Sequence, residues 1–144
     1  MFLPILKKIE EISGKKTEEN PKAFRIIADH IKASTFLLAA EVEPSNLGRG
    51  YILRRLMRRA IRYGKQLGIN ESFLSKIYSA VLEVYNGFYS EIESKEDFIV
   101  RQVQFAHEQI EQEIKMAEEI MESLEKDSLF EILNILDTWH KRLK

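Results

Sequence analysis

The residues of this sequence best suited to chemistry are arginines, and the chemistry they suit is the binding of anions. No acidic residue occurs from Pro44 to Asn70, and five arginines crowd into the middle of that stretch, at Arg54, Arg55, Arg58, Arg59 and Arg62. The whole chain of 144 residues has a formal net charge of -1, so its basic charge is concentrated here. A segregated basic surface of this kind is typical of proteins that bind a polyanion.

The basic stretch has the periodicity of an amphipathic helix. Four basic residues, spaced by four, four and three positions, share one side and are called the basic stripe: Arg54, Arg58, Arg62 and Lys65. The adjoining side is apolar and consists of Ile52, Leu53, Leu56, Met57, Ala60 and Ile61. We expect the apolar side to pack into the core and the basic stripe to contact a phosphate backbone. The alternative is a solvated face that pairs with glutamates of neighbouring helices.

A turn precedes this helix and contains the uncharged Asn46. Gly48 and Gly50 permit backbone conformations with positive φ, and the side chains of Ser45 and Asn46 can bond to nearby backbone groups. From residue type alone, Asn46 has two interpretations: it caps the helix, or its amide binds a ligand. Arg49 lies beside it in the sequence and could help to position a polyanion.

The sequence predicts no catalytic centre. It contains no cysteine, and its three histidines, His30, His107 and His140, lie far apart in the chain. It has no glycine-rich phosphate loop, no pair of histidines at metal-binding spacing and no nucleophile with a base nearby in sequence. We therefore expect no metal and no cofactor in this chain.

The N-terminus lacks the features of a secretory signal peptide, and no apolar run is long enough to span a membrane. Together with the absence of cysteine, this is consistent with a cytoplasmic protein without membrane contact. Acidic residues dominate from Glu91 to Glu131, where 13 acids stand against four bases. A nucleic acid is therefore expected to meet the basic zone and to be repelled by much of the acidic one.

The fold class predicted is all-α, because helix-forming residues are abundant and the chain has only three prolines and six glycines. We expect a single domain over residues 1–144, built as a bundle of about six helices with a long charged helix in its C-terminal half. Asn20 and Pro21 should start the central, most buried helix, since Asn caps a helix and Pro suits its first position.

Apolar spacing and turn residues give the helix limits. Gly64 and Gly68 stand where the basic helix should stop, and Asn70 could cap the next one. Asp127 and Ser128 should separate two further helices. The predicted helices cover residues 2–12, 21–40, the basic stretch, 73–84, 91–125 and 129–143.

Two stretches of the sequence resemble the helical tRNA-recognition region of alanyl-tRNA synthetases. They are RIIADHIKA at residues 25–33 and PSNLGRGYILRRLMRRA at residues 44–60. The similarity is closest over residues 1–90, while residues 91–144 are more diverged. Within the diverged part, ILDTW at residues 135–139 looks like the family's L-Y-D-T-Y-G segment, although Trp139, His140 and Lys141 replace its Y-G-F.

This resemblance implies a function in recognition. The family's target would be the acceptor stem of alanine tRNA, marked by a G·U wobble pair at the third position. The family reads this pair with the Asn of P-S-N and the Asp of L-Y-D, which correspond to Asn46 and Asp137 here. A wobble pair leaves the guanine amino group unpaired for a carboxylate acceptor, and it exposes the uracil O4 to an amide donor. Without the resemblance, Asp137 would be taken for a solvated helix residue.

The site predicted for tRNA therefore has two parts. Asn46 and Asp137 would recognise bases, and five residues would contact the backbone: Arg49, Arg54, Arg58, Arg62 and Lys65. In the family, the class II catalytic core, with its ATP and Mg²⁺, and the editing and C-terminal domains lie outside the region matched here. We expect this chain alone to be inactive and to position tRNA for that catalytic domain. The alternatives are a protein-interaction module that docks through its basic helix and a domain that binds RNA without sequence preference.

Overall fold

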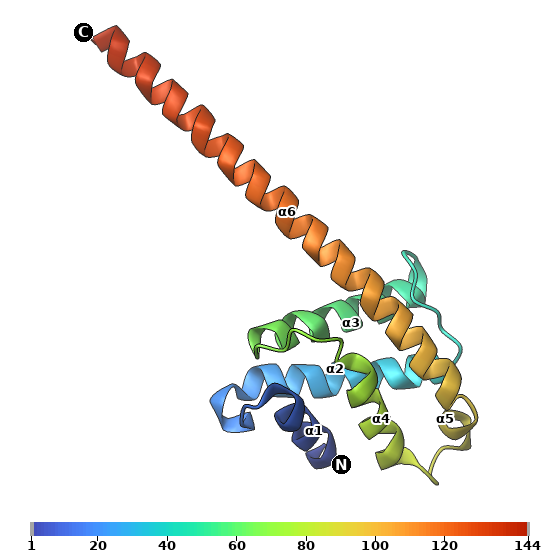
Figure 1. Cartoon of the computed structure of the whole chain (residues 1–144). Coiled ribbons are helices and arrows are strands. Elements are labelled where there is room, and N and C mark those ends of the chain that lie inside the picture. Colours follow the sequence, from blue (N-terminus) through green and yellow to red (C-terminus); the bar gives the residue numbers. More distant parts are fainter. Residues whose placement is uncertain (1, 144) are drawn as a thin grey trace. The chain divides into compact units, whose positions relative to one another are not determined.

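The computed structural model describes residues 2–143, with side chains for residues 2–142, and is all-α as predicted (Figure 1). It contains six α-helices and a short 3-10 helix, and no strand in the described part. The elements are α1 (Leu3–Ser13), η1 (Thr17–Glu19), α2 (Pro21–Ala39), α3 (Gly48–Gln66), α4 (Leu74–Tyr85), α5 (Ser90–Ser94) and α6 (Glu96–Leu143). The chain divides into two compact units, residues 1–110 and 111–144, and the boundary between them falls within α6.

Helix α2 is the central element of the first unit, and this confirms the prediction. It begins at Pro21, and the side-chain oxygen of Asn20 accepts a hydrogen bond of 3.2 Å from the backbone N–H of Ala23. The helix packs against α1, α3, α4 and α5 (Figure 1). Its buried apolar residues are Ala23, Phe24, Ile27, Ala28, Ile31, Leu38 and Ala39. Burial on several sides makes α2 the support of the elements around it.

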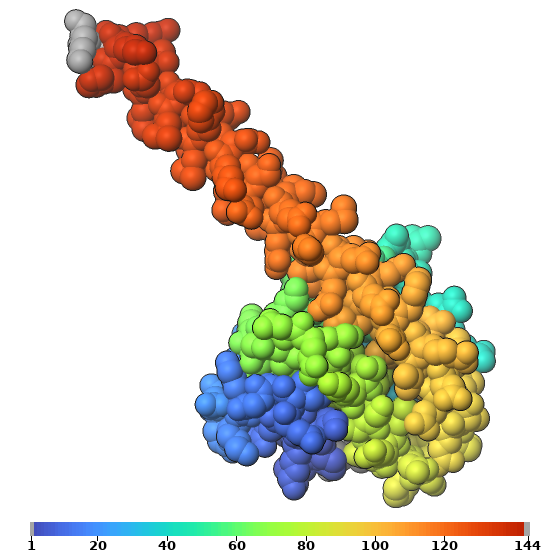
Figure 2. Space-filling view, viewed as in Figure 1, coloured from blue at the N-terminus to red at the C-terminus, as the bar shows by residue number. Residues whose placement is uncertain are grey.

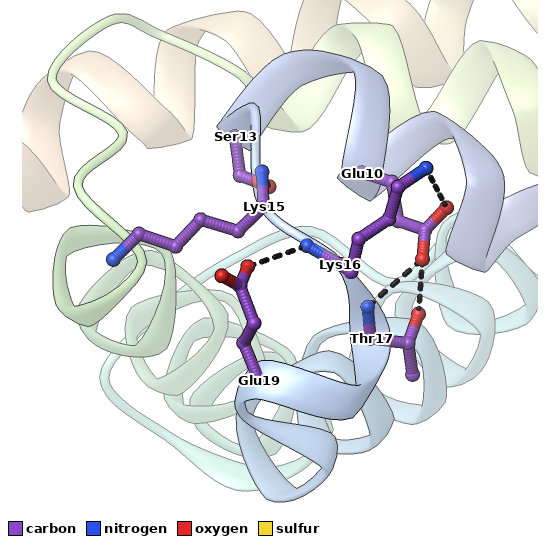
Figure 3. A network of polar contacts seen from close by, with 6 residues as sticks. All are labelled: Glu10, Ser13, Lys15, Lys16, Thr17 and Glu19. Atoms are coloured by element: carbon purple, nitrogen blue, oxygen red, sulfur yellow. Dashed lines mark hydrogen bonds and ion pairs between the residues drawn. The ribbon is translucent and has the colours of Figure 1, made fainter.

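A polar network fixes the passage from α1 to α2 (Figure 3). The backbone N–H and the hydroxyl of Thr17 donate hydrogen bonds of 2.8 and 2.9 Å to the Glu10 carboxylate. The Lys16 ammonium lies 3.8 Å from the same carboxylate. The hydrogen bonds from Thr17 and the charge of Lys16 hold the pKa of Glu10 below its usual value. Helix α1 also packs against α4. The two helices are the blue and yellow-green segments that adjoin in Figure 2.

Of the limits predicted near α3, Gly68 is confirmed as the glycine that follows the end of the helix, whereas a stop at Gly64 and a cap at Asn70 are wrong. Gly64 lies inside α3 and is buried against the ring of Phe73. A Cβ at this position would collide with that ring, so the close packing requires glycine. The helix instead ends at Gln66, and Gly68 follows with φ +82°. Asn70 does not start the next helix, since α4 begins at Leu74. The connection between α3 and α4 is anchored by burial of Leu67, Ile69 and Phe73, of which only Phe73 belongs to the predicted helical pattern.

The separation of two helices at Asp127 and Ser128 is also wrong. Helix α6 runs without a break from Glu96 to Leu143, and the short α5 precedes it. No glycine or proline occurs after Gly87, so nothing in this part of the chain strongly opposes a helix. In the second unit, the described side chains from Lys115 to Arg142 are all exposed. Ion pairs four residues apart, such as Lys126 with Glu122 at 3.3 Å, support the helix locally.

Among the described residues, no helix is both long enough and apolar enough to cross a membrane.

Candidate nucleic-acid interface

Helix α3 separates an apolar side from a basic one, as its sequence predicts. Leucine and arginine are good helix formers, and the apolar residues that return every three to four positions face the core: Leu53, Met57, Ala60 and Ile61 are buried. Ile52, which the sequence assigned to the apolar side, is 54% exposed. Among the basic residues, Arg54 and Arg58 are half-buried, whereas Arg55, Arg59, Arg62 and Lys65 are exposed.

The basic side of α3 carries a hollow of about 490 Å³. Four guanidinium groups and two phenol rings line this hollow, and no carboxylate does. We call it the arginine groove; its residues are Tyr51, Arg55, Arg58, Arg59, Arg62, Tyr63 and Gln66. The Arg59 guanidinium lies over the Tyr63 ring at 5.9 Å from its centre. Such a surface offers many hydrogen-bond donors, fixed charges and aromatic faces to an anion.

The arginines that line the arginine groove are not the same set as those of the basic stripe. Arg58 and Arg62 belong to both, whereas Arg55 and Arg59 line the groove and were not among the predicted backbone contacts. The sequence does hold a signal for them, because groove residues recur at helical spacing from Tyr51 through Arg55 onward. Arg49 lies in the first turn of α3 and Lys65 in its last, and both are exposed.

The charge of the groove reaches the central helix. His30, on α2, is partly buried, and this burial lowers the pKa of its imidazole below 6.5. The Arg59 guanidinium lowers it further, while the neighbouring Asp29 carboxylate acts in the opposite direction. The pKa of His30 on α2 is therefore sensitive to the positive charge of the neighbouring helix α3.

The turn before α3 is closely packed and holds Asn46 at an exposed position. The backbone N–H of Ser45 donates a 3.1 Å hydrogen bond to the carbonyl of Gly50. The Ser45 hydroxyl also donates to the Leu47 carbonyl, at 3.0 Å. A Cβ on Gly50 would collide with the Ser45 hydroxyl and the Glu43 carbonyl, so this close approach requires glycine. The backbone around Asn46 is thus defined by the turn itself.

Asn46 does not cap α3, which excludes one of its two interpretations. The residue at the capping position is Leu47, and no side chain caps the helix there. The side-chain oxygen of Asn46 instead accepts a 2.6 Å hydrogen bond from Nη1 of Arg54. The sequence predicts separate roles for these two residues, whereas the structure brings them into contact. Eight positions separate them, a spacing for which no helical or turn motif predicts a contact.

A second hollow, of about 290 Å³, lies beside Arg54 within the first unit. Pro44 from the turn and Phe105 from α6 contribute apolar surface to it. Its full lining is Glu43, Pro44, Arg54, Gln102, Phe105, Ala106, Gln109 and Ile110. Arg54 thus lines this hollow, and its guanidinium contacts Asn46.

Asp137, the other residue predicted to read a base, belongs to the second unit. It lies in α6 with an exposed side chain, and its carboxylate is 2.9 Å from the ammonium of Lys141, one helical turn away. The local structure therefore leaves Asp137 accessible. Elsewhere in the described part, no group of three or more His, Asp and Glu side chains is arranged to hold a metal ion.

The described residues thus form an all-α fold in which one helix carries the arginine groove and follows a glycine-containing turn. A family model described as tRNA synthetases class II (A) matches residues 1–139. The chain therefore belongs to the alanyl-tRNA synthetase family of class II.

Individual relatives agree with this assignment. The chain is 42% identical over 131 residues to the alanine-tRNA ligase of Listeria innocua, which covers 89% of this chain and 15% of the ligase. It is 50% identical over 107 residues to that of Borreliella burgdorferi, covering 71% of this chain and 18% of the ligase. The enzyme of Geobacillus thermodenitrificans is 40% identical over 133 residues, which is 88% of this chain and 15% of the ligase. The chain thus corresponds to less than a fifth of each of these relatives.

Proposed function

We propose that this chain binds tRNA and presents the acceptor stem of alanine tRNA to a class II catalytic domain of the same synthetase. The observation that carries the proposal is the arginine groove, where four guanidinium groups converge on one exposed side of α3 without a carboxylate. Phosphate groups match arginine in charge and in the geometry of its paired donors. Membership of the alanyl-tRNA synthetase family supports tRNA as the source of those phosphates.

In this proposal the basic residues supply affinity. Arg58 and Arg62 line the groove, while Arg49 and Lys65 lie exposed near the two ends of α3. A phosphate backbone that follows the helix would therefore meet positive charge along its whole length. Such contacts position an RNA without reading its sequence. Acidic residues dominate α6, so the affinity for the phosphate backbone would come from α3.

The bases would be read by Asn46 and Asp137. The Asn46 amide is suited to donate a hydrogen bond to the uracil O4 of a G·U pair, since that atom only accepts. The Asp137 carboxylate is suited to accept from the guanine amino group that the wobble leaves unpaired. Asn46 is exposed in a rigid turn, and Asp137 is exposed on α6. Both side chains are therefore accessible for such contacts.

The chain would contribute positioning and no bond chemistry of its own. Holding a substrate in register can supply a large share of a rate enhancement even when the reacting groups lie on another domain. ATP and Mg²⁺ would belong to that catalytic domain, and the whole assembly would act in the cytoplasm. The competing function is docking of α3 on an acidic protein surface.

A binding measurement tests the proposal. We expect an RNA minihelix with a G·U third pair to bind the chain more tightly than the same stem with G·C, and Asn46→Ala to remove the difference. Asn70→Ala, an exposed asparagine in the connection between α3 and α4 and outside the arginine groove, is the matched control and should keep it. Equal binding of the two stems by the unaltered chain would refute specific recognition, and no RNA binding at low salt would favour the protein-docking function.

A further inference from the structure

The hydrogen bond between Arg54 and Asn46 fixes the orientation of an amide. An arginine guanidinium can only donate hydrogen bonds, and of the two ends of an asparagine amide only the oxygen accepts them. The 2.6 Å contact from Nη1 of Arg54 therefore assigns the Asn46 oxygen to the side facing Arg54. The NH2 group must then point away from Arg54, where it is a donor for another partner.

We propose that Arg54 is a positioning residue that holds the Asn46 amide with its NH2 group presented to a carbonyl acceptor on an RNA base. The inference rests on the proposed function, because it takes Asn46 as the residue that reads the base. It changes the part played by Arg54. The sequence predicts that Arg54 contacts phosphate together with the other members of the basic stripe. In the structure its guanidinium instead donates a hydrogen bond to Asn46.

Each partner of the hydrogen bond is held in place by further contacts. Arg54 is half-buried on α3, next to the fully buried Leu53, and its side chain lines the hollow that contains Phe105. Asn46 stands in the turn closed by the backbone bond between Ser45 and Gly50. A side chain fixed at its far end by a second residue keeps its orientation better than one held by solvent alone.

Fixing the amide matters because uracil and cytosine present opposite groups at the same place. Uracil O4 accepts a hydrogen bond, whereas the N4 amino group of cytosine donates one. An unrestrained asparagine could rotate its amide by half a turn and accept from cytosine as readily as it donates to uracil. When Arg54 holds the Asn46 oxygen, the Asn46 NH2 group would face the N4 amino group of cytosine in the G·C stem. Both groups are donors, so no hydrogen bond can form between them. Arg54 would thus contribute discrimination more than affinity.

This role is distinguishable from a phosphate contact. Loss of a phosphate contact weakens binding of every stem alike. It also lowers the slope of log Kd against the logarithm of the salt concentration by about one. Loss of the positioning bond weakens binding of the G·U stem, improves binding of the G·C stem and leaves the salt dependence unchanged. Arg54→Met is a suitable variant, because it removes the donors and keeps an unbranched side chain to line the hollow.

The experiment measures Kd for both stems at several salt concentrations. For Arg54→Met we expect the preference for the G·U stem to fall about tenfold, the effect of losing one charged hydrogen bond. Arg58→Met, on the groove, is the control and should weaken both stems alike while preserving the preference. If Arg54→Met behaves like Arg58→Met, Arg54 contacts phosphate and the positioning role is refuted.

A second measurement keeps the inference separate from the proposed function. In ¹H–¹⁵N spectra of the RNA-free chain, Arg54→Met should shift the side-chain NH2 signals of Asn46 toward those of an unrestrained asparagine, and Arg58→Met should not. If these signals stay in place, Arg54 does not orient the amide and the inference fails, whatever RNA binds. If they move but the unaltered chain does not distinguish the stems, the proposed function fails instead.

Discussion

The ring of Phe73 lies against the backbone of α3 at Gly64, where the atoms of even one methyl group would collide with it. The contact joins the helix that carries the arginine groove to the buried connection that leads to α4. Phe73 is 1% exposed and also packs edge-on against His107 of α6, with 5.6 Å between ring centres. Three elements of the first unit therefore meet at this ring, and the position of the groove depends on the packing around it.

Gly64→Ala should destabilise the first unit. Alanine is intrinsically better than glycine in a helix by about 1 kcal/mol. Overpacking against a ring held on several sides costs about 1–3 kcal/mol and should outweigh that gain. We expect a lower midpoint in urea denaturation, followed by circular dichroism. Gln66→Ala at the exposed end of the same helix is the control, and an unchanged or higher midpoint for Gly64→Ala would show that the contact is not tight.

The pKa of His30 predicts a pH dependence of both stability and binding. Because the folded-state pKa is lowered, the unfolded chain binds the proton more readily. The contribution of His30 to stability is therefore complete above pH 6.5 and is lost as the pH falls through the lowered pKa. Phosphates in the arginine groove should offset the charge of Arg59 and raise the pKa of His30. RNA binding should then strengthen as the pH falls through the pKa that His30 has in the complex.

An NMR titration of the His30 ring protons measures this directly. Arg59→Gln should raise the pKa of His30 in the RNA-free chain, because it removes a nearby positive charge. Lys65→Gln, an exposed change near the end of α3, serves as the control. A His30 pKa that is the same with and without RNA would place the phosphates away from Arg59.

Arg55 should matter for RNA binding although the basic stripe omits it. It lines the arginine groove together with Arg62. We expect Arg55→Ala to weaken binding of both stems about as much as Arg62→Ala and to reduce the salt dependence by about one ion. Lys76→Ala removes an exposed charge on α4 and should change neither quantity. If Arg55→Ala resembles Lys76→Ala, the RNA does not occupy the groove.

The features that were predicted correctly are those that depend on neighbours in the chain. The cap at Asn20, the start at Pro21 and the stripe of Leu53 and Met57 each follow from local hydrogen bonding or from helical periodicity. The separation of α6 into two helices was wrong for a related reason. Asp127 and Ser128 are good capping residues, but without a glycine or proline beside them they also fit within a helix.

By itself, the sequence determined the all-α class, the order of the principal helices, the basic side of α3 and the family, because composition, period and motif are local properties. The tertiary structure decided which residues share a surface. It showed that Gly64 makes room for Phe73, that Arg55 and Arg59 join the groove, and that Arg54 reaches Asn46. These contacts depend on how α3 packs and how the turn folds back on it, and neither the 3.6-residue period nor residue type specifies that geometry.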